Sequence, residues 1–196
     1  MQENTHDREA AEKLLKEYVK SETLIKHAIT VEAVMRHFAS LFNEDADEWG
    51  IIGLLHDIDF EMYPDEHCHK TRSILEPRQW PESYIRAIES HGYKLCSDVE
   101  PITNQEKVLY TIDELTGLIS ATALMRPSKS LFDLTVKSVK KKWKQKSFAE
   151  GVNREVIEEG AANLKMDLDY VMEQTIEGMK KVAAQIGLEG NIEAAK

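Results

Sequence analysis

Four residues of metal-binding type lie in strongly apolar parts of this sequence. His56 and Asp57 follow the stretch GIIGLL, Asp113 lies inside VLYTIDEL, and His27 lies where apolar residues recur at helical spacing. A buried carboxylate is costly unless it is paired with a cation or binds a metal. Two imidazoles and two carboxylates suit Fe, Mn, Zn, Co or Ni better than calcium. Taken singly, each residue could also be a hydrogen-bonded structural residue.

Three more histidines, His67, His69 and His91, lie between Asp57 and Asp113. Residues two positions apart on a helix point to different sides, so one ion would take only one of His67 and His69. The alternative is that these histidines are surface or core residues without a metal role.

The elements that must position these residues are all predicted to be helical. Apolar positions recur at helical spacing nearly throughout, and no long stretch alternates with a period of two. We predict a long helix that carries His27 and ends near Asn43. A core helix should then start at Asp45 and end at His56 and Asp57.

Gly50 and Gly53 lie within the core helix, and we attribute them to the close approach of another backbone. The segment Ile58 to Glu66 contains Pro64 and clustered acids, so it is predicted to be a loop. Asp113 should lie in the middle of a second long helix. That helix is introduced by residues 101–104 and stopped by Pro127, and the other predicted helices after the loop cover residues 67–76, 82–91, 130–145, 153–164 and 169–186.

The order of these residues resembles the HD superfamily of metal-dependent phosphohydrolases, whose pattern is an early His, an adjacent His-Asp and a later Asp. The match runs through His27 in TLIKHAITVEAVM, His56 and Asp57 in GLLHDID, and Asp113 in LYTIDELTGLI. The segments DELTGLISATALMRPSK and KSVKKKWKQKSFAEGVNRE further resemble stand-alone bacterial HD proteins. The resemblance implies an all-α, compact helical bundle. We expect a single HD-type domain over residues 1–196, with a metal-binding core at about 20–126 and a C-terminal helical extension at about 127–196.

Many HD proteins bind two metal ions, and the resemblance implies the ligands of both. The segment HCHKTRSIL resembles the family segment in which a His precedes a helix ending in Ile-Leu, although Thr71 stands where a Gly is usual. We therefore prefer His67 over His69 as a ligand of the second ion, together with His91 and Asp57 as a bridge. The ligands of the first ion would be His27, His56, Asp57 and Asp113.

The family's common Gly-Lys after His-Asp is replaced here by IDFE, so no lysine role is carried over. Asp57, Asp59 and Glu61 are the candidate catalytic acids, the last two as carboxylates that support a ligand or act as a general base. The candidate anion contacts for a substrate are the basic residues Arg126, Lys129, Lys144 and Arg154.

Composition limits the kind of protein. The chain has 196 residues, of which 42% are hydrophobic and 31% charged, as in ordinary globular proteins. No apolar run approaches the roughly 18 residues of a membrane span, and the start MQENTHDREAAEKLL is polar rather than signal-like, so we expect a cytoplasmic protein without membrane contact. Cys68 and Cys96 are too few for a disulfide framework and are interpreted as structural residues in a reducing compartment.

The net charge of −10 argues against general nucleic-acid binding, because the protein would repel the phosphate backbone. The charge is uneven, with six lysines and no acid between Lys137 and Lys146. This segment is either a solvated helix face or a contact for an anionic ligand or partner.

Together these features predict a phosphohydrolase that acts on a small phosphorylated metabolite or nucleotide. Metal ions of this type lower the pKa of bound water toward about 7 and screen the charge of a phosphoryl group. Two alternatives remain open. One is an HD-fold di-iron oxygenase, which shares the same six ligands, and the other is a non-catalytic module in which the ion is structural or a ligand is only sensed.

Overall fold

A computed structural model describes residues 6–195 of the chain. This part folds into α-helices joined by turns and contains no strand, which confirms the predicted all-α class. No helix in it is long and apolar enough to cross a membrane. The helices are α1 (Arg8–Tyr18), α2 (Glu22–Phe42), α3 (Ala46–Leu55), α4 (Thr71–Leu75), α5 (Glu82–Ser90), α6 (Asn104–Leu124), α7 (Val136–Trp143), α8 (Arg154–Asn163), α9 (Leu168–Lys180) and α10 (Ala183–Ile186), with short 3₁₀ turns at Pro64–Glu66, Glu76–Arg78 and Ile192–Ala195.

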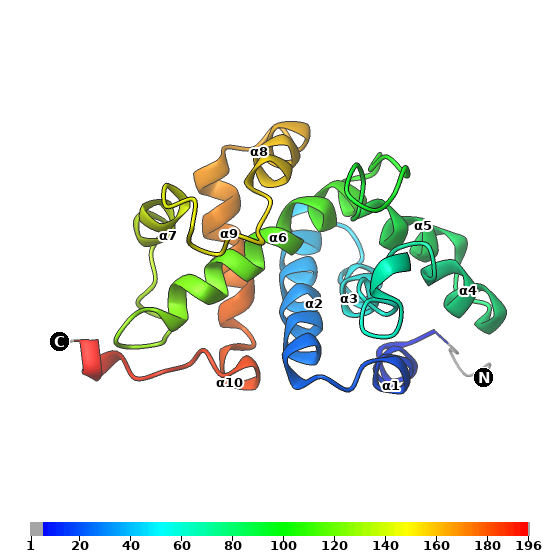
Figure 1. The fold of residues 1–196 in the computed structure, drawn as a ribbon, viewed down its shortest axis with the longest axis horizontal. Coiled ribbons are helices and arrows are strands. Elements are labelled where there is room, and N and C mark those ends of the chain that lie inside the picture. Colours follow the sequence, from blue (N-terminus) through cyan, green and yellow to red (C-terminus); the bar gives the residue numbers. More distant parts are fainter. Residues whose placement is uncertain (1–5, 196) are drawn as a thin grey trace.

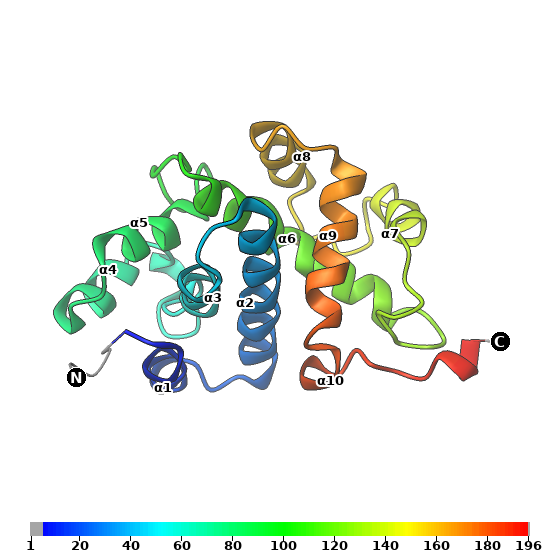
Figure 2. The same cartoon turned by 180° about the vertical axis from the view of Figure 1, so that it is seen from behind.

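The long helix α2 lies at the centre of the molecule. Figure 1 shows α1, α3, α4 and α5 on one side of α2, and α7, α9 and α10 on the other, with α6 crossing between the two sides. Seen from behind, α9 lies beside α2 while α3 lies on the other side of α2 (Figure 2). The two long helices α2 and α6 therefore bring residues from distant parts of the sequence to one place.

The boundaries of α2 and α3 agree with the sequence. Asn43 ends α2 in the left-handed conformation, at a φ of 55°, which asparagine tolerates better than most residues. Asp45 caps α3, because its carboxylate accepts hydrogen bonds from the backbone N–H groups of Asp47 and Glu48. His56 is the C-cap residue of α3, so the His-Asp pair does lie at a helix terminus.

Only one of the two glycines of α3 has the predicted role. A Cβ atom at Gly53 would lie 3.1 Å from the backbone Cα of Glu32, so Gly53 permits the close approach of α2 and α3. At Gly50, by contrast, a Cβ atom would meet the side chain of Arg36 rather than a backbone. The prediction was therefore wrong for Gly50, which makes room for a guanidinium that binds Glu32 and Asp47.

The short helices are less regular than predicted. Residues 67–70 form turns, and Cys68 has a φ of 66°, which no α-helix accommodates. Residues 130–135 are also turns, because Ser130 Oγ accepts from the N–H of Phe132 and Thr135 caps a helix that starts only at Val136. The last predicted helix is divided between α9 and α10, and α1 was not predicted, although Asp7 provides its cap.

Candidate metal centre

Four donor atoms, from α2, from α6 and from the two residues that follow α3, converge at one place. The Nε2 atom of His27, on α2, lies 3.1 Å from Nε2 of His56 and 2.9 Å from Oδ1 of Asp113, on α6. The Nε2 atom of His56 lies 3.3 Å from Oδ1 of Asp113 and 3.3 Å from Oδ2 of Asp57. Separations of about 3 Å are those expected between atoms that each lie about 2.1 Å from one ion.

A second group of donors surrounds the other oxygen of Asp57. Its Oδ1 atom lies 3.4 Å from Nε2 of His67 and 3.5 Å from Nε2 of His91, and these two nitrogen atoms are 3.2 Å apart. His67 lies in the turn before α4, and His91 caps the end of α5. The two oxygens of Asp57 thus face different groups of imidazoles, which is the arrangement of a bridging carboxylate.

The imidazoles are oriented by hydrogen bonds at their Nδ1 atoms. The Nδ1 atom of His56 donates to the Gly53 carbonyl at 2.8 Å, and that of His91 donates to the Ile88 carbonyl. The Nδ1 atom of His67 donates to Oδ1 of Asp59 at 2.8 Å. With the proton on Nδ1, the lone pair of each neutral ring lies on Nε2 and faces a carboxylate oxygen. Two facing acceptors repel each other unless a proton or a cation lies between them.

The pKa shifts of the four-donor group also indicate that a positive charge belongs between these atoms. Burial alone would lower the pKa of His56, but the charges of Asp57 and Asp113 outweigh burial and raise it well above its usual value. Burial likewise favours neutral carboxyl groups, yet the charge of His56 holds the pKa of Asp57 and of Asp113 well below the usual range. Positive charge at this place is therefore strongly favoured.

Comparison with known families agrees with this geometry. Residues 24–118 match the family model described as the HD domain. This part of the chain is an HD domain. All six candidate ligands lie within it, whereas no curated protein and no solved structure matches the chain.

The other two candidate catalytic acids, Asp59 and Glu61, have different environments. Asp59 is fully buried and accepts hydrogen bonds from His67 and from the hydroxyl of Thr71, so it orients a candidate ligand rather than facing a substrate. Glu61 is exposed and accepts from the backbone N–H groups of Lys20 and Ser21, at the start of α2. Neither acid lines the cavity at the centre. His69 is exposed and has no part in either group of donors.

All the candidate ligands except His56 line a cavity of about 380 Å³. None of the described residues that line it is a lysine or an arginine. Apart from the ligands, its lining residues are Phe60, Gly92, Leu95, Cys96, Glu114, Gly117, Gly151 and Val152. Sequence reasoning missed Glu114, although this acid directly follows Asp113. Burial raises the pKa of Glu114, whose carboxylate accepts from the backbone N–H of Asn153.

None of the four basic residues predicted to contact a substrate lines this cavity. Arg154 donates to the carbonyls of Trp143, Gln145, Phe148 and Val152, so it holds together the loop that precedes α8. Arg126 is likewise engaged, with Asp133 at 2.6 Å.

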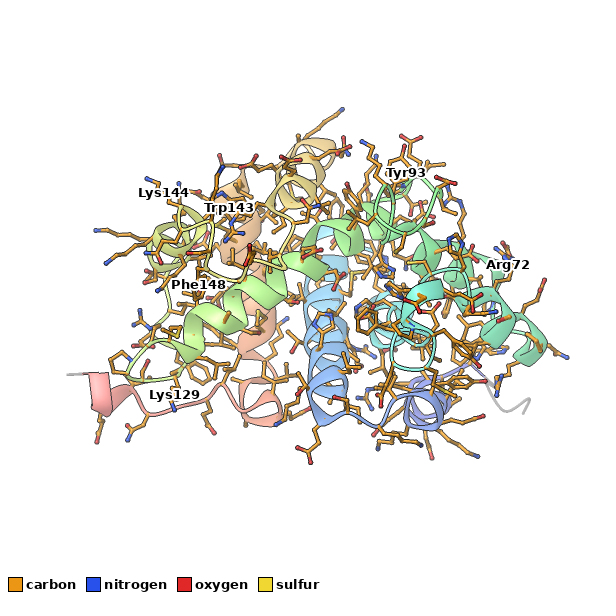
Figure 3. All side chains as sticks on the ribbon, viewed as in Figure 1. Arg72, Tyr93, Lys129, Trp143, Lys144 and Phe148 are labelled. Atoms are coloured by element: carbon orange, nitrogen blue, oxygen red, sulfur yellow. The ribbon has the colours of Figure 1, made fainter. Side chains whose placement is uncertain are left out.

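Lys129 and Lys144 are exposed, and Figure 3 shows both on the side of α7, far from Arg72 on the opposite side of the molecule. The lysine-rich segment forms α7, where Lys140 pairs with Asp169 and Lys142 lies over the ring of Phe148. The lysines of this segment are absent from the lining of the cavity at the metal centre, and both interpretations of the segment stay predictions.

Proposed function

We propose that this protein is a metal-dependent phosphohydrolase with two adjacent divalent metal positions that share Asp57. His27, His56, Asp57 and Asp113 would hold the first ion, and Asp57, His67 and His91 the second. The observation that carries this proposal is the set of Nε2 lone pairs that face carboxylate oxygens at 3.3–3.5 Å while the Nδ1 atoms are already bound. This donor chemistry fits divalent transition metals.

Bound ions of this kind supply an activated water at neutral pH and screen the negative charge of a phosphoryl group. The chain itself positions the ligands. The helix end at His56, the buried carboxylate of Asp59 and the Ile88 carbonyl each fix one imidazole ring. Glu114 places a carboxylate at the cavity wall, within the part of the centre that a substrate would reach.

The cavity also limits the substrate. Its volume of about 380 Å³ suits a small molecule. Because none of the described residues that line it is a lysine or an arginine, the charge that attracts an anion would have to come from the metal positions themselves. A small phosphorylated metabolite or nucleotide meets both conditions.

Removal of the shared carboxylate tests the proposal. Asp57→Ala should reduce the metal content from about two equivalents to less than one and abolish phosphate release, because this side chain faces both groups of imidazoles. Asp65→Ala, at an exposed acid in the same loop, is the matched control and should keep both ions. Metal analysis and phosphate release from nucleotides and sugar phosphates are the measurements. Two equivalents of metal in Asp57→Ala would contradict the shared position.

The two neighbouring histidines of HCHK provide a second test. His67→Ala should lower the metal content from about two equivalents to about one, because the first position keeps all four of its ligands. His69→Ala should leave it near two, since its ring is exposed. Loss of metal in His69→Ala instead would overturn the assignment.

The reaction class is tested separately from the metals. The protein loaded with Mn²⁺ should release phosphate from at least one phosphomonoester of a broad panel. If the metal-loaded protein releases none, and the iron-loaded protein consumes oxygen with a small organic substrate, the hydrolase proposal is overturned in favour of oxygen chemistry.

A further inference from the structure

The two cysteines of the chain, interpreted from sequence as structural residues, lie side by side. Their Sγ atoms are 2.9 Å apart, although 28 positions separate them in the sequence. Cys68 directly follows His67, and Cys96 lies in the turn after His91. The pair therefore joins the two segments that carry the imidazoles of the proposed second metal position.

The local backbone holds both sulfur atoms in this position. A Cβ atom at Gly92 would lie only 2.5 Å from Sγ of Cys68 and would also collide with Sγ of Cys96, so the two thiols pack directly on a glycine. The Gly92 carbonyl accepts from the N–H groups of Leu95, Cys96 and Ser97, which fixes the turn. A larger residue at position 92 would separate the thiols.

The two thiols differ in access. Cys68 is 1% exposed, whereas Cys96 is partly exposed and lines the cavity of the metal centre. A small oxidant that enters this cavity therefore reaches Cys96 first. Cys68 then lies within reach of the sulfur that has been oxidised.

We propose that Cys68 and Cys96 are a modification site for hydrogen peroxide, at which a reversible disulfide forms and links the segments of His67 and His91. In the first step the sulfur of Cys96 attacks one peroxide oxygen, so an S–O bond forms, the O–O bond breaks and one water leaves. In the second step the sulfur of Cys68 attacks that of Cys96, an S–S bond forms, the S–O bond breaks and a second water leaves. The two thiols lose two hydrogens and two electrons, which reduce one peroxide. An added dithiol reverses the reaction.

Oxidation should also affect metal binding, a consequence that rests on the proposed function. The sulfur atoms must approach from 2.9 Å to about 2.05 Å apart, and the disulfide then ties the segments of His67 and His91 to each other. The donor atoms of a metal site lie within about 0.2 Å of their ideal distances from the ion, so a constraint that displaces either imidazole weakens binding. We therefore expect the disulfide to weaken the second position while the first keeps its four ligands.

Mass spectrometry of the intact, metal-free protein tests the disulfide directly. Treatment with hydrogen peroxide should lower the mass by about 2 Da, yield a peptide joined through Cys68 and Cys96, and leave a protein that dithiothreitol restores. Cys68→Ser should instead gain oxygen at Cys96, because no second thiol is present. A wild-type protein that gains oxygen without a crosslink, or that keeps both thiols free, would overturn the proposal. The wild-type result stands even if a variant fails to fold.

Titration with Mn²⁺ after removal of the oxidant tests the link to the metal centre. The second equivalent should bind about tenfold or more weakly to the oxidised protein than to the reduced one, and dithiothreitol should restore it. Equal binding of two equivalents by both forms would overturn the link. If even the reduced protein binds no Mn²⁺, the proposed metal centre is overturned, and so is its link to the disulfide. The disulfide itself is tested independently by mass spectrometry.

Discussion

At the scale of single residues, protons and metal compete most directly at His56. Its Nδ1 atom is bound to the Gly53 carbonyl, so Nε2 is the only ring atom available to either. Its imidazole is fully buried against Asp57 and Asp113, which raise its pKa well above 6.5. The raised pKa therefore favours the protonated ring in the metal-free protein. The charged ring stabilises the metal-free fold. This contribution is fully present below pH 6.5, the usual pKa of histidine, and is lost as the pH rises through the raised pKa of His56.

Metal affinity should show the opposite dependence on pH. A metal must displace the proton from Nε2, so affinity for the first ion should fall, by up to about tenfold for each pH unit, as the pH drops below the raised pKa of His56. Calorimetric titrations with Mn²⁺ in buffers of different ionisation enthalpy would measure both the affinity and the protons released. Binding that is independent of pH and releases no proton would contradict this account of the centre.

At the scale of the elements, α6 depends on its first turn for its position. Thr103 Oγ1 accepts from the N–H of Glu106, whose carboxylate in turn accepts from the N–H of Thr103 and also binds Arg86. Thr103→Ala should lower the free energy of unfolding by about 1 kcal/mol, because one helix N–H loses its acceptor. Asp113 lies in the third turn of the helix, away from the cap, so the metal content should not change. Chemical denaturation and metal analysis of the same preparation test both parts.

The elements that could be predicted from sequence are those with regular apolar spacing. The helices that carry His27 and Asp113 and the helix end at His56 follow from that spacing, and so do four of the candidate ligands. The turns between α3 and α4 do not. Asp59 and Glu61 are equivalent in the sequence, yet Asp59 is buried against His67 while Glu61 binds the start of α2. Such a difference depends on how the loop packs, which spacing does not encode.

The roles of the arginines could not be predicted from sequence either. Arg154 was predicted to bind a substrate because the residue type suits anions, but its guanidinium faces backbone carbonyls. A carbonyl carries no signature of its own in the sequence, so this use of an arginine could not be foreseen. The proximity of Cys68 to Cys96 was missed for a related reason, since the left-handed backbone at Cys68 is a property of the folded turn.

At the scale of the whole molecule, α9 attaches the C-terminal part of the chain to α2. A Cβ atom at Gly178 would lie 2.9 Å from the backbone Cα of Val34, and a helix backbone cannot shift by a small side-chain movement. Gly178→Ala should therefore destabilise the protein by about 1–3 kcal/mol. Gly151→Ala is a matched control, because nothing lies within 4 Å of the added atom. Equal thermal stability of the two variants would contradict the prediction that the close packing of α9 on α2 at Gly178 leaves no room for a Cβ atom.

The loop held by Arg154 has a consequence for how this protein can change during evolution. All six candidate ligands belong to residues 24–118, but Gly151 and Val152, which close the cavity, belong to a segment outside that range. Substitutions in the loop can therefore alter which molecules enter without disturbing the inherited metal ligands. Exchange of residues 143–153 between two such chains would transfer selectivity while the reaction stayed the same.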